Sequence, residues 1–174
     1  MRILINMKKN IILIGFMGVG KGTVARVFAS EFDTYAIDTD DLIESLENRK
    51  IKEIFESEGE EYFRALETKT AKWLTKSVQN AIISTGGGFY KQKKLNDIGK
   101  VVLLDASFDA IYERILAHPN AKRKLQKRPL FQDTKKAKAL YKERTDGYKE
   151  VADLIVNVEG KTPQEIAKEI YKKV

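Results

Sequence analysis

The stretch IILIGFMGVGKGT, residues 11–23, decides the fold that we expect of this chain. Its four leading apolar residues predict a buried strand, its glycines predict a tight loop, and a helical segment is expected from Val24 to Phe32. In such a loop, successive backbone N–H groups converge on phosphate oxygens at the positive end of a helix, and the lysine reaches the outer phosphates. The stretch therefore predicts a nucleoside triphosphate site.

Two features of this loop carry the prediction further. Gly18 and Gly20 are expected to adopt backbone angles that side chains would forbid. Gly22 is unusual, because the residue after the lysine is commonly a Ser or Thr whose hydroxyl contacts Mg²⁺, and Thr23 comes one place later. The nucleotide-binding residues predicted here are Gly18, Val19, Gly20, Lys21, Gly22 and Thr23.

Length and composition predict one catalytic domain spanning residues 1–174. A chain of 174 residues, 43% of them hydrophobic, can bury a substantial core. We expect no membrane partner, because no apolar run approaches the ~20 residues of a membrane helix and the start lacks a signal-length apolar region. The absence of cysteine fits a reducing compartment and a cytoplasmic location. Residues 1–6 precede a second methionine and are treated as an extension.

The net charge of +7 is concentrated in one segment. Between residues 118 and 144 there are ten Lys or Arg residues against two acidic ones. The regular interleaving of aromatic residues with such charges, which is typical of a single-strand binding surface, is missing there. We therefore expect this segment to serve a polyphosphate ligand, and we expect no nucleic-acid partner.

Strand and helix signals alternate along the rest of the chain. Strands are expected at residues 35–38, 81–84, 101–104 and 154–156, and further helices within 40–77 and at 107–117, 134–151 and 163–173. Alternation with continuous apolar strands predicts an α/β fold, a five-stranded parallel sheet with helices on both faces. Ligands then bind at the carboxyl ends of the strands. Residues 118–133 combine proline, asparagine and charge, and we expect them to form a mobile lid.

Several local details are also predicted. Thr39 or Asp40 is expected to cap the helix that follows the second strand. A short helix from Ile51 should end near Gly59, before a longer helix that carries Phe63. The last strand, 154–156, is expected to be buried like the fourth.

Carboxylates follow two of the predicted strands. Asp38 ends the second strand and is a candidate Mg²⁺ ligand, while Asp40 can accept a hydrogen bond from a substrate hydroxyl. Asp105 is a competing metal ligand, because it follows four apolar residues in the usual form of a Walker B strand. It also lies at a strand-helix junction, where it has an easy structural role.

Five pieces, taken in order, resemble the shikimate kinase family from about Lys9 to the C-terminus. They are the glycine loop, Asp38-Thr39-Asp40, Phe63-Arg64 with Glu67, residues 83–88 ending in Gly86-Gly87-Gly88, and Arg128-Pro129 followed by Arg144 and Tyr148. The glycine loop is shared by many nucleotide-binding families, whereas the ordered set is specific. The resemblance favours Asp38 over Asp105 as the metal ligand.

The resemblance implies a P-loop kinase that transfers the γ-phosphoryl group of ATP to the 3-hydroxyl of shikimate with Mg²⁺, as a monomer, in aromatic amino-acid biosynthesis. It implies that Lys21, Asp40 and Arg128 are catalytic, that Arg114, Arg128 and Lys161 join the glycine loop in binding nucleotide, and that Asp40, Arg64, Gly86, Gly87, Gly88 and Arg144 bind the substrate. Phe55 and Phe63 match residues that line the substrate pocket. For the metal we expect Asp38 with water and Ser84 or Thr23, because Gly22 has no hydroxyl.

Other functions stay open at this point. The Lys-Gly-Thr order is familiar from adenylate kinases, although no stretch resembles their nucleoside-monophosphate site. Two arginines for one carboxylate would also suit a gluconate kinase. A nucleotide-dependent switch or a nucleic-acid-binding protein is the alternative without catalysis, but the guanine-reading Asn-Lys-x-Asp sequence is absent.

Overall fold

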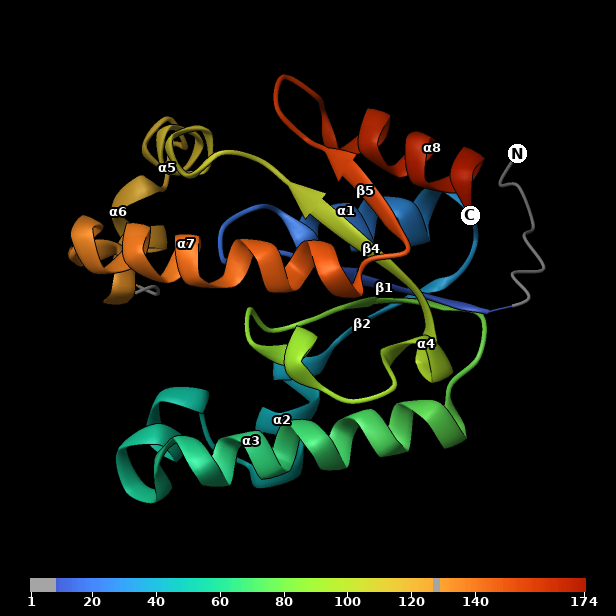
Figure 1. Cartoon of the computed structure of the whole chain (residues 1–174), viewed down its shortest axis with the longest axis horizontal. Coiled ribbons are helices and arrows are strands. Elements are labelled where there is room, and N and C mark those ends of the chain that lie inside the picture. Colours follow the sequence, from blue (N-terminus) through green and yellow to red (C-terminus); the bar gives the residue numbers. More distant parts are fainter. Residues whose placement is uncertain (1–8, 127–128) are drawn as a thin grey trace.

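The computed structural model of the chain describes residues 9–126 and 129–174 (Figure 1). Its centre is a five-stranded parallel sheet in the order β2-β3-β1-β4-β5. The strands are β1 (Asn10–Ile14), β2 (Tyr35–Asp38), β3 (Ala81–Ser84), β4 (Gly99–Asp105) and β5 (Leu154–Asn157). The predicted α/β class and five-stranded parallel sheet are confirmed.

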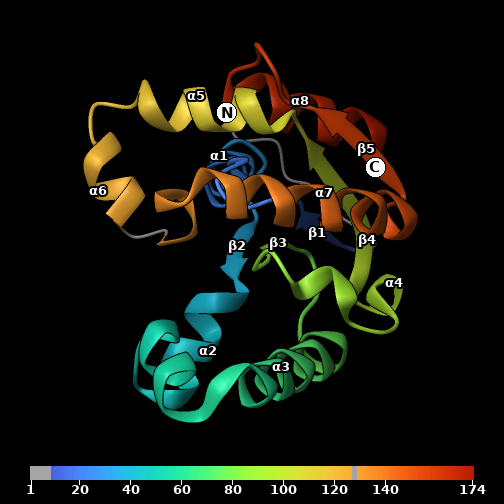
Figure 2. The same ribbon diagram turned by 60° about the vertical axis from the view of Figure 1, so that its left-hand side comes forward.

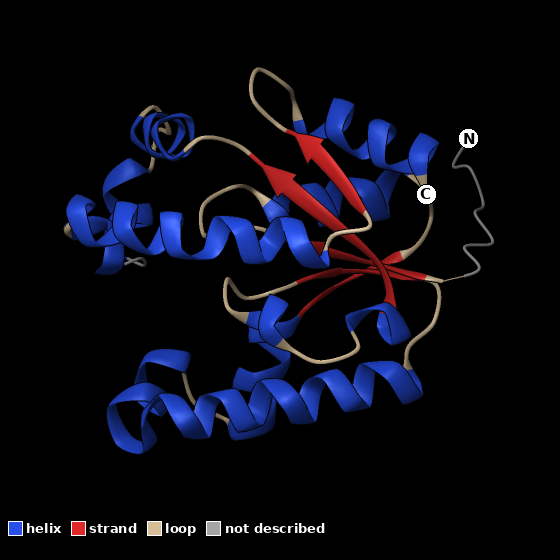
Figure 3. Ribbon diagram, viewed as in Figure 1, coloured by secondary structure: helices blue, strands red, loops and turns tan. Residues whose placement is uncertain are grey.

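Helices cover both faces of this sheet (Figure 3). The helices are α1 (Lys21–Glu31), α2 (Thr39–Glu47), α3 (Ile51–Ser77), α4 (Leu95–Ile98), α5 (Phe108–Leu116), α6 (Ala121–Gln126), α7 (Thr134–Val151) and α8 (Pro163–Lys173), with 3-10 turns η1 (Phe89–Lys91) and η2 (Pro129–Gln132). In Figure 1, α7 crosses in front of the sheet and α1 lies behind it. Helix α8 packs beside α1.

The central strands are apolar because they are buried on both faces. Every residue of β1 and β3 is buried, and Ile11 and Ile12 of β1 pair in register with Ile82 and Ile83 of β3. The expected burial of β5 is wrong, because β5 is an edge strand and Ile155 is 45% exposed. Sequence order alone does not say which strand ends a sheet.

Helices α2 and α3 extend from the carboxyl end of β2 and form a second, smaller core (Figure 2). Ile43, Ile54, Phe63 and Leu66 make up this core. Helix α3 is interrupted at Gly59, where φ is +84°, so the expected break between a short and a longer helix is confirmed. Glycine adopts this left-handed conformation without the strain that a side chain would bring.

One local prediction needs correction. The N-cap of α2 is Asp38, whose Oδ1 accepts hydrogen bonds from the backbone N–H groups of Asp40 and Asp41, so the expected cap at Thr39 or Asp40 is wrong. Residues 118–133, for which we expect a loop or lid outside the sheet, contain α6 and η2. Within the described residues, no helix is long and apolar enough to span a membrane.

Candidate active site

The glycine loop joins β1 to α1 at the carboxyl edge of the sheet. Gly15, Gly18 and Gly20 have φ values of +142°, +82° and +104°, which confirms the angles expected for Gly18 and Gly20. Gly18 is also constrained by space, since a Cβ atom there would lie 2.8 Å from Cδ1 of Ile115. The loop is thus held in a conformation that only glycines allow, as a backbone cradle for phosphate requires.

Lys21 lies inside this loop. Its side chain is buried, and Nζ donates hydrogen bonds to the carbonyl oxygens of Gly15 and Phe16 at 2.6 and 3.1 Å. The ammonium group is therefore fixed beside the backbone groups that would receive a phosphate. A buried cation in this place offsets phosphate charge more strongly than an exposed one.

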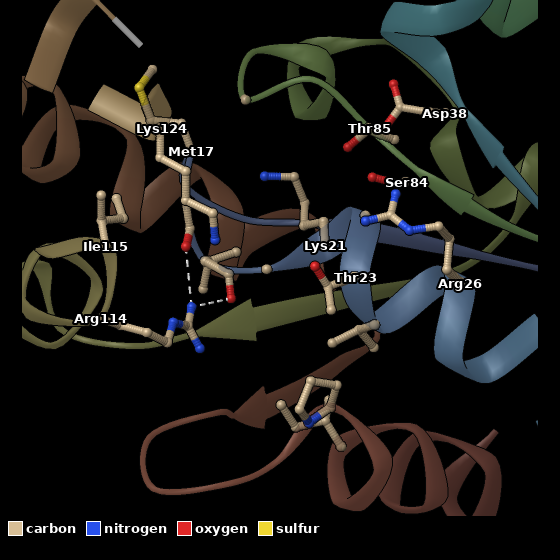
Figure 4. A pocket seen from close by; sticks show the side chains of 18 of the residues that line it. Met17, Lys21, Thr23, Arg26, Asp38, Ser84, Thr85, Arg114, Ile115 and Lys124 are labelled. Carbon is tan, nitrogen blue, oxygen red and sulfur yellow. Dashed lines mark hydrogen bonds between the residues drawn. The ribbon is translucent and has the colours of Figure 1, made fainter. Parts of the chain in front are cut away.

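A cavity of about 560 Å³ opens over the loop (Figure 4). It gathers residues from the ends of β1, β2 and β3 and from α5 and α8, as expected for a parallel sheet. Its predicted members are Gly18, Val19, Gly20, Lys21, Gly22, Thr23, Asp38, Asp40, Ser84, Gly86, Gly87, Arg114 and Lys161.

Two cations frame the cavity on the side of α5 and α8. Arg114 donates from Nη2 to the carbonyl oxygens of Gly18 and Val19, at 3.1 and 2.5 Å (Figure 4). Burial lowers the pKa of this guanidinium. Lys161 is held by Glu169, with Nζ and Oε2 2.7 Å apart. Both residues line the cavity.

Oxygen donors suited to Mg²⁺ meet beside the loop. Asp38 and Ser84 are paired in register at the ends of β2 and β3, and both line the cavity. The two cap hydrogen bonds of Asp38 end on Oδ1, and Oδ2 accepts no hydrogen bond from the described residues. Mg²⁺ takes one or two carboxylates together with hydroxyl, water and phosphate oxygens, and Asp38, Ser84 and Thr23 fit that donor set. Among the described residues, no cluster of three His, Cys, Asp or Glu side chains forms a metal site.

Asp40 lies deeper in the site, against Gly86. A Cβ atom at residue 86 would stand 2.7 Å from Oδ1 of Asp40, so the glycine leaves room for the carboxylate. Burial, and next the negative charge of Asp38, raise the pKa of Asp40 to about 6. Such a carboxyl group is poised to exchange a proton near neutral pH.

The next two glycines leave room for the two arginines expected to bind substrate. A Cβ atom at Gly87 would lie 3.1 Å from Nη1 of Arg144, and one at Gly88 would lie 2.9 Å from Cζ of Arg64. Tyr148 holds this turn, because its hydroxyl donates to the carbonyl oxygen of Gly87 at 2.6 Å. Each glycine of the triplet thus faces one charged side chain.

Glu67 completes the cluster around the glycine triplet. It is buried, and its Oε2 accepts a hydrogen bond from Nη1 of Arg64 at 2.7 Å. Burial raises the pKa of Glu67, although Arg64 opposes the rise. Three buried polar atoms here have no hydrogen-bond partner among the described residues: Oδ1 of Asp40, Oε1 of Glu67 and Nε of Arg144. Buried polar atoms are normally paired, so these three point to a bound polar molecule.

Some predicted residues stand apart from the cavity. Arg64, Gly88 and Arg144 do not line the cavity. Arg144 lies beside Gly87, which does line it, and Arg64 lies beside Gly88. The predicted catalytic Arg128 lies outside the described residues. Asp105 contributes to a separate, much smaller hollow.

The two predicted aromatic residues also lie outside the cavity lining. Phe63 is buried in the smaller core, and its ring packs against that of Phe55 with centroids 4.7 Å apart. Phe63 therefore takes part in the packing of α2 against α3, whereas Phe55 is 38% exposed.

The cavity also contains residues that the sequence did not single out. His118 and Lys124 come from the segment after α5, and Pro163 and Ile166 come from the start of α8. In the sequence, Pro163 indicates only the start of a helix, and no neighbouring residue indicates that it belongs to a site. For Arg26 a sequence signal exists, because it follows Gly22 by four residues and therefore lies on the same face of the helix.

A parallel sheet of this strand order, with a glycine loop and buried lysine after its first strand, defines the chain as a P-loop phosphotransferase. The family model described as shikimate kinase matches residues 17–174. A shikimate kinase of Helicobacter hepaticus is 41% identical over 164 residues, which cover 94% of this chain and 95% of that protein. The chain belongs to the shikimate kinase family.

Solved structures agree with this assignment. The crystal structure of shikimate kinase from Aquifex aeolicus has a TM-score of 0.74 at 36% identity and covers 94% of both chains. Shikimate kinase from Acinetobacter baumannii, solved in complex with shikimate, has a TM-score of 0.75 at 30% identity, covering 95% of this chain and 92% of that one.

Proposed function

We propose that this chain transfers the γ-phosphoryl group of ATP to the 3-hydroxyl of shikimate, giving shikimate 3-phosphate and ADP. The observation that carries the proposal is the set of unpaired buried atoms on Asp40, Glu67 and Arg144 around the glycine triplet. A small ring that bears hydroxyls and one carboxylate supplies what these atoms lack. Hydroxyls donate to the two acidic side chains, and the carboxylate accepts from the arginine.

The acceptor carboxylate is bound by Arg144 together with Arg64. A planar guanidinium matches a carboxylate with two parallel hydrogen bonds, so two arginines fix both position and orientation. Glu67 keeps Arg64 in place through their 2.7 Å ion pair. Backbone N–H groups of the glycine triplet can approach the ring because no side chain intervenes.

Phosphoryl transfer then depends on positioning and charge. Lys21 and the loop N–H groups hold the outer phosphates, and Asp40 accepts the proton of the attacking hydroxyl. Asp38, Ser84 and Thr23 would hold Mg²⁺, which when bound neutralises charge on the phosphate oxygens. Arg128 is the residue proposed to reach the transferring group when the segment 118–133 closes over ATP and excludes water.

We further propose that the enzyme is a monomer of the cytoplasm. The absence of cysteine supports a reducing compartment.

A substrate panel tests the function. ADP release is followed with ATP and Mg²⁺ in the presence of shikimate, gluconate or AMP, each at several concentrations. We expect saturable turnover with shikimate and background rates with the other two. Turnover with AMP or gluconate alone would contradict the proposal and favour the corresponding kinase.

A further inference from the structure

Gly22 is not required by its own backbone. It lies within α1, and it is not among the glycines of positive φ, which include Gly15, Gly18 and Gly20. A Cβ atom at Gly22 would meet no backbone atom closely. Its nearest neighbours would be Nη1 of Arg26 at 3.4 Å and Oγ of Ser84 at 3.8 Å. A Cβ atom alone would thus be in ordinary van der Waals contact with the Arg26 guanidinium, whereas an atom beyond it, such as the Oγ of a serine, would compete with Arg26 for the space.

Arg26 turns back along α1 toward the cavity. It lies one helical turn beyond Gly22 and lines the cavity together with Asp38 and Ser84. Figure 4 shows its guanidinium extending from α1 toward Ser84. Arg26 makes no hydrogen bond or ion pair with the rest of the described chain. A cation that points into this cavity, with no hydrogen bond or ion pair to the described residues, is available to an anionic ligand.

The guanidinium stands beside the oxygen donors that suit Mg²⁺. Nη1 of Arg26 and Oγ of Ser84 both approach the same point, the place of the absent Cβ of Gly22. Two cations cannot share that space without repulsion. Arginine also forms two parallel hydrogen bonds to phosphate oxygens, which are the oxygens that a metal ion would take.

We propose that Arg26 is an additional nucleotide-binding residue, which uses the space at Gly22 to contact the phosphates of metal-free ATP and which Mg²⁺ displaces. The inference rests on the proposed function in one respect, namely that this cavity binds ATP. It predicts that Arg26 contributes to binding of the metal-free nucleotide and little to binding of the magnesium complex.

Calorimetry with a non-hydrolysable ATP analogue tests this without any turnover. The analogue is titrated into wild type, Arg26→Ala and Arg26→Gln, once with EDTA and once with excess Mg²⁺. A charged hydrogen bond contributes about 1.5–3 kcal/mol, so both variants should bind metal-free analogue about 10- to 100-fold more weakly. Binding of the magnesium complex should change less than about threefold.

Two further variants sharpen the test. Lys72→Ala removes an exposed cation from α3, away from the cavity lining, and should change neither affinity. Gly22→Ser places a side chain against Arg26, so it should weaken metal-free binding, and adding Arg26→Ala to it should weaken that binding little further. Equal weakening of both nucleotide forms by Arg26→Ala, or no weakening of either, would overturn the inference alone. Failure of wild type to bind either form would overturn the proposed function as well.

Discussion

At the scale of single residues, Asp40 stands out because burial raises the pKa of its carboxyl group well above the usual value. Its carboxylate is buried against Gly86, Oδ1 has no partner among the described residues, and its pKa is raised to about 6. The ionised form of such a group lowers the free energy of unfolding, and in the proposed reaction the same group accepts a proton. Two predictions separate these effects.

The first prediction concerns activity. As a base, Asp40 must be ionised, so kcat/KM for shikimate should fall about tenfold per pH unit below pH 6, where the carboxyl group is protonated. Asp40→Asn should lower kcat by about 10²- to 10⁴-fold. The exposed neighbour Asp41 offers a matched control, since Asp41→Asn should leave kcat near that of wild type. Steady-state rates of Asp40→Asn close to wild type would remove Asp40 from catalysis.

The second prediction concerns stability. The pKa of Asp40 is about 6 in the folded chain against a usual 3.8, so the folded state binds this proton more tightly than the unfolded state. Its ionisation therefore costs stability above pH 6, and the cost shrinks as the pH falls toward 3.8. Asp40→Asn should raise the free energy of unfolding by about 1–3 kcal/mol at pH 8 and by less at pH 5. Urea denaturation at the two pH values measures this, and a destabilised variant at pH 8 would contradict it.

At the scale of elements, the turn after β3 does more than join two segments. Gly86, Gly87 and Gly88 face Asp40, Arg144 and Arg64 in turn, and Tyr148 fixes the turn from α7. The three charged side chains are thus arranged along the turn in the order of the glycines that they face.

Gly88→Ala tests this arrangement. Its Cβ atom would stand 2.9 Å from Cζ of Arg64 and would push the guanidinium aside. We expect KM for shikimate to rise at least tenfold, because a charged hydrogen bond to the carboxylate is weakened, while KM for ATP changes little. An unchanged KM for shikimate in Gly88→Ala would show that Arg64 does not bind the substrate from this position.

Helix α8 contributes Pro163 and Ile166 to the cavity lining, and hydrogen bonds at its N-cap stabilise its first turn. Thr162 Oγ1 accepts from the N–H of Glu165 at 3.2 Å, and Glu165 Oε2 accepts from the N–H of Thr162 at 2.8 Å. Loss of an N-cap costs about 1 kcal/mol, so Thr162→Ala should lower Tm by about 2–4 °C. Thr162→Ser keeps the hydroxyl and should keep the wild-type Tm. Calorimetric scans that show the same Tm for the alanine variant would contradict the cap.

Most elements could be predicted from the sequence because their signals are local. The bounds of β2, β3, α7 and α8 agree with expectation, as does the break at Gly59. The missed α4 is a single turn, too short to show a helical period. The cap at Asp38 was misassigned because three consecutive polar residues were candidates and their backbone geometry selects among them.

At the scale of the whole molecule, sheet order makes the site. The glycine loop, the Asp38–Asp40 segment and the glycine triplet follow β1, β2 and β3, which are neighbours in the order β2-β3-β1. The loop could be predicted from the sequence alone because it is continuous. The four-residue spacing of Gly22 and Arg26 also predicts that they share a helix face. The approach of each triplet glycine to its charged partner could not be predicted, because it depends on how side chains pack once the sheet is formed.

In the proposed function, the same order would place the two substrates side by side. The cavity over the loop would take the phosphates, and the cluster around the glycine triplet adjoins it through Asp40, Gly86 and Gly87. A hydroxyl held at Asp40 would therefore face the outermost phosphate. Transfer to that hydroxyl should give a single phosphate ester.

The most direct test is to identify the atom that receives the phosphoryl group. The purified chain is incubated with ATP, Mg²⁺ and shikimate, and the product is examined by ³¹P and ¹H NMR, in which coupling locates the phosphorus on the ring. We predict a phosphate ester on the 3-hydroxyl, formed in step with ADP. An ester on another hydroxyl, or release of inorganic phosphate with shikimate unchanged, would contradict it.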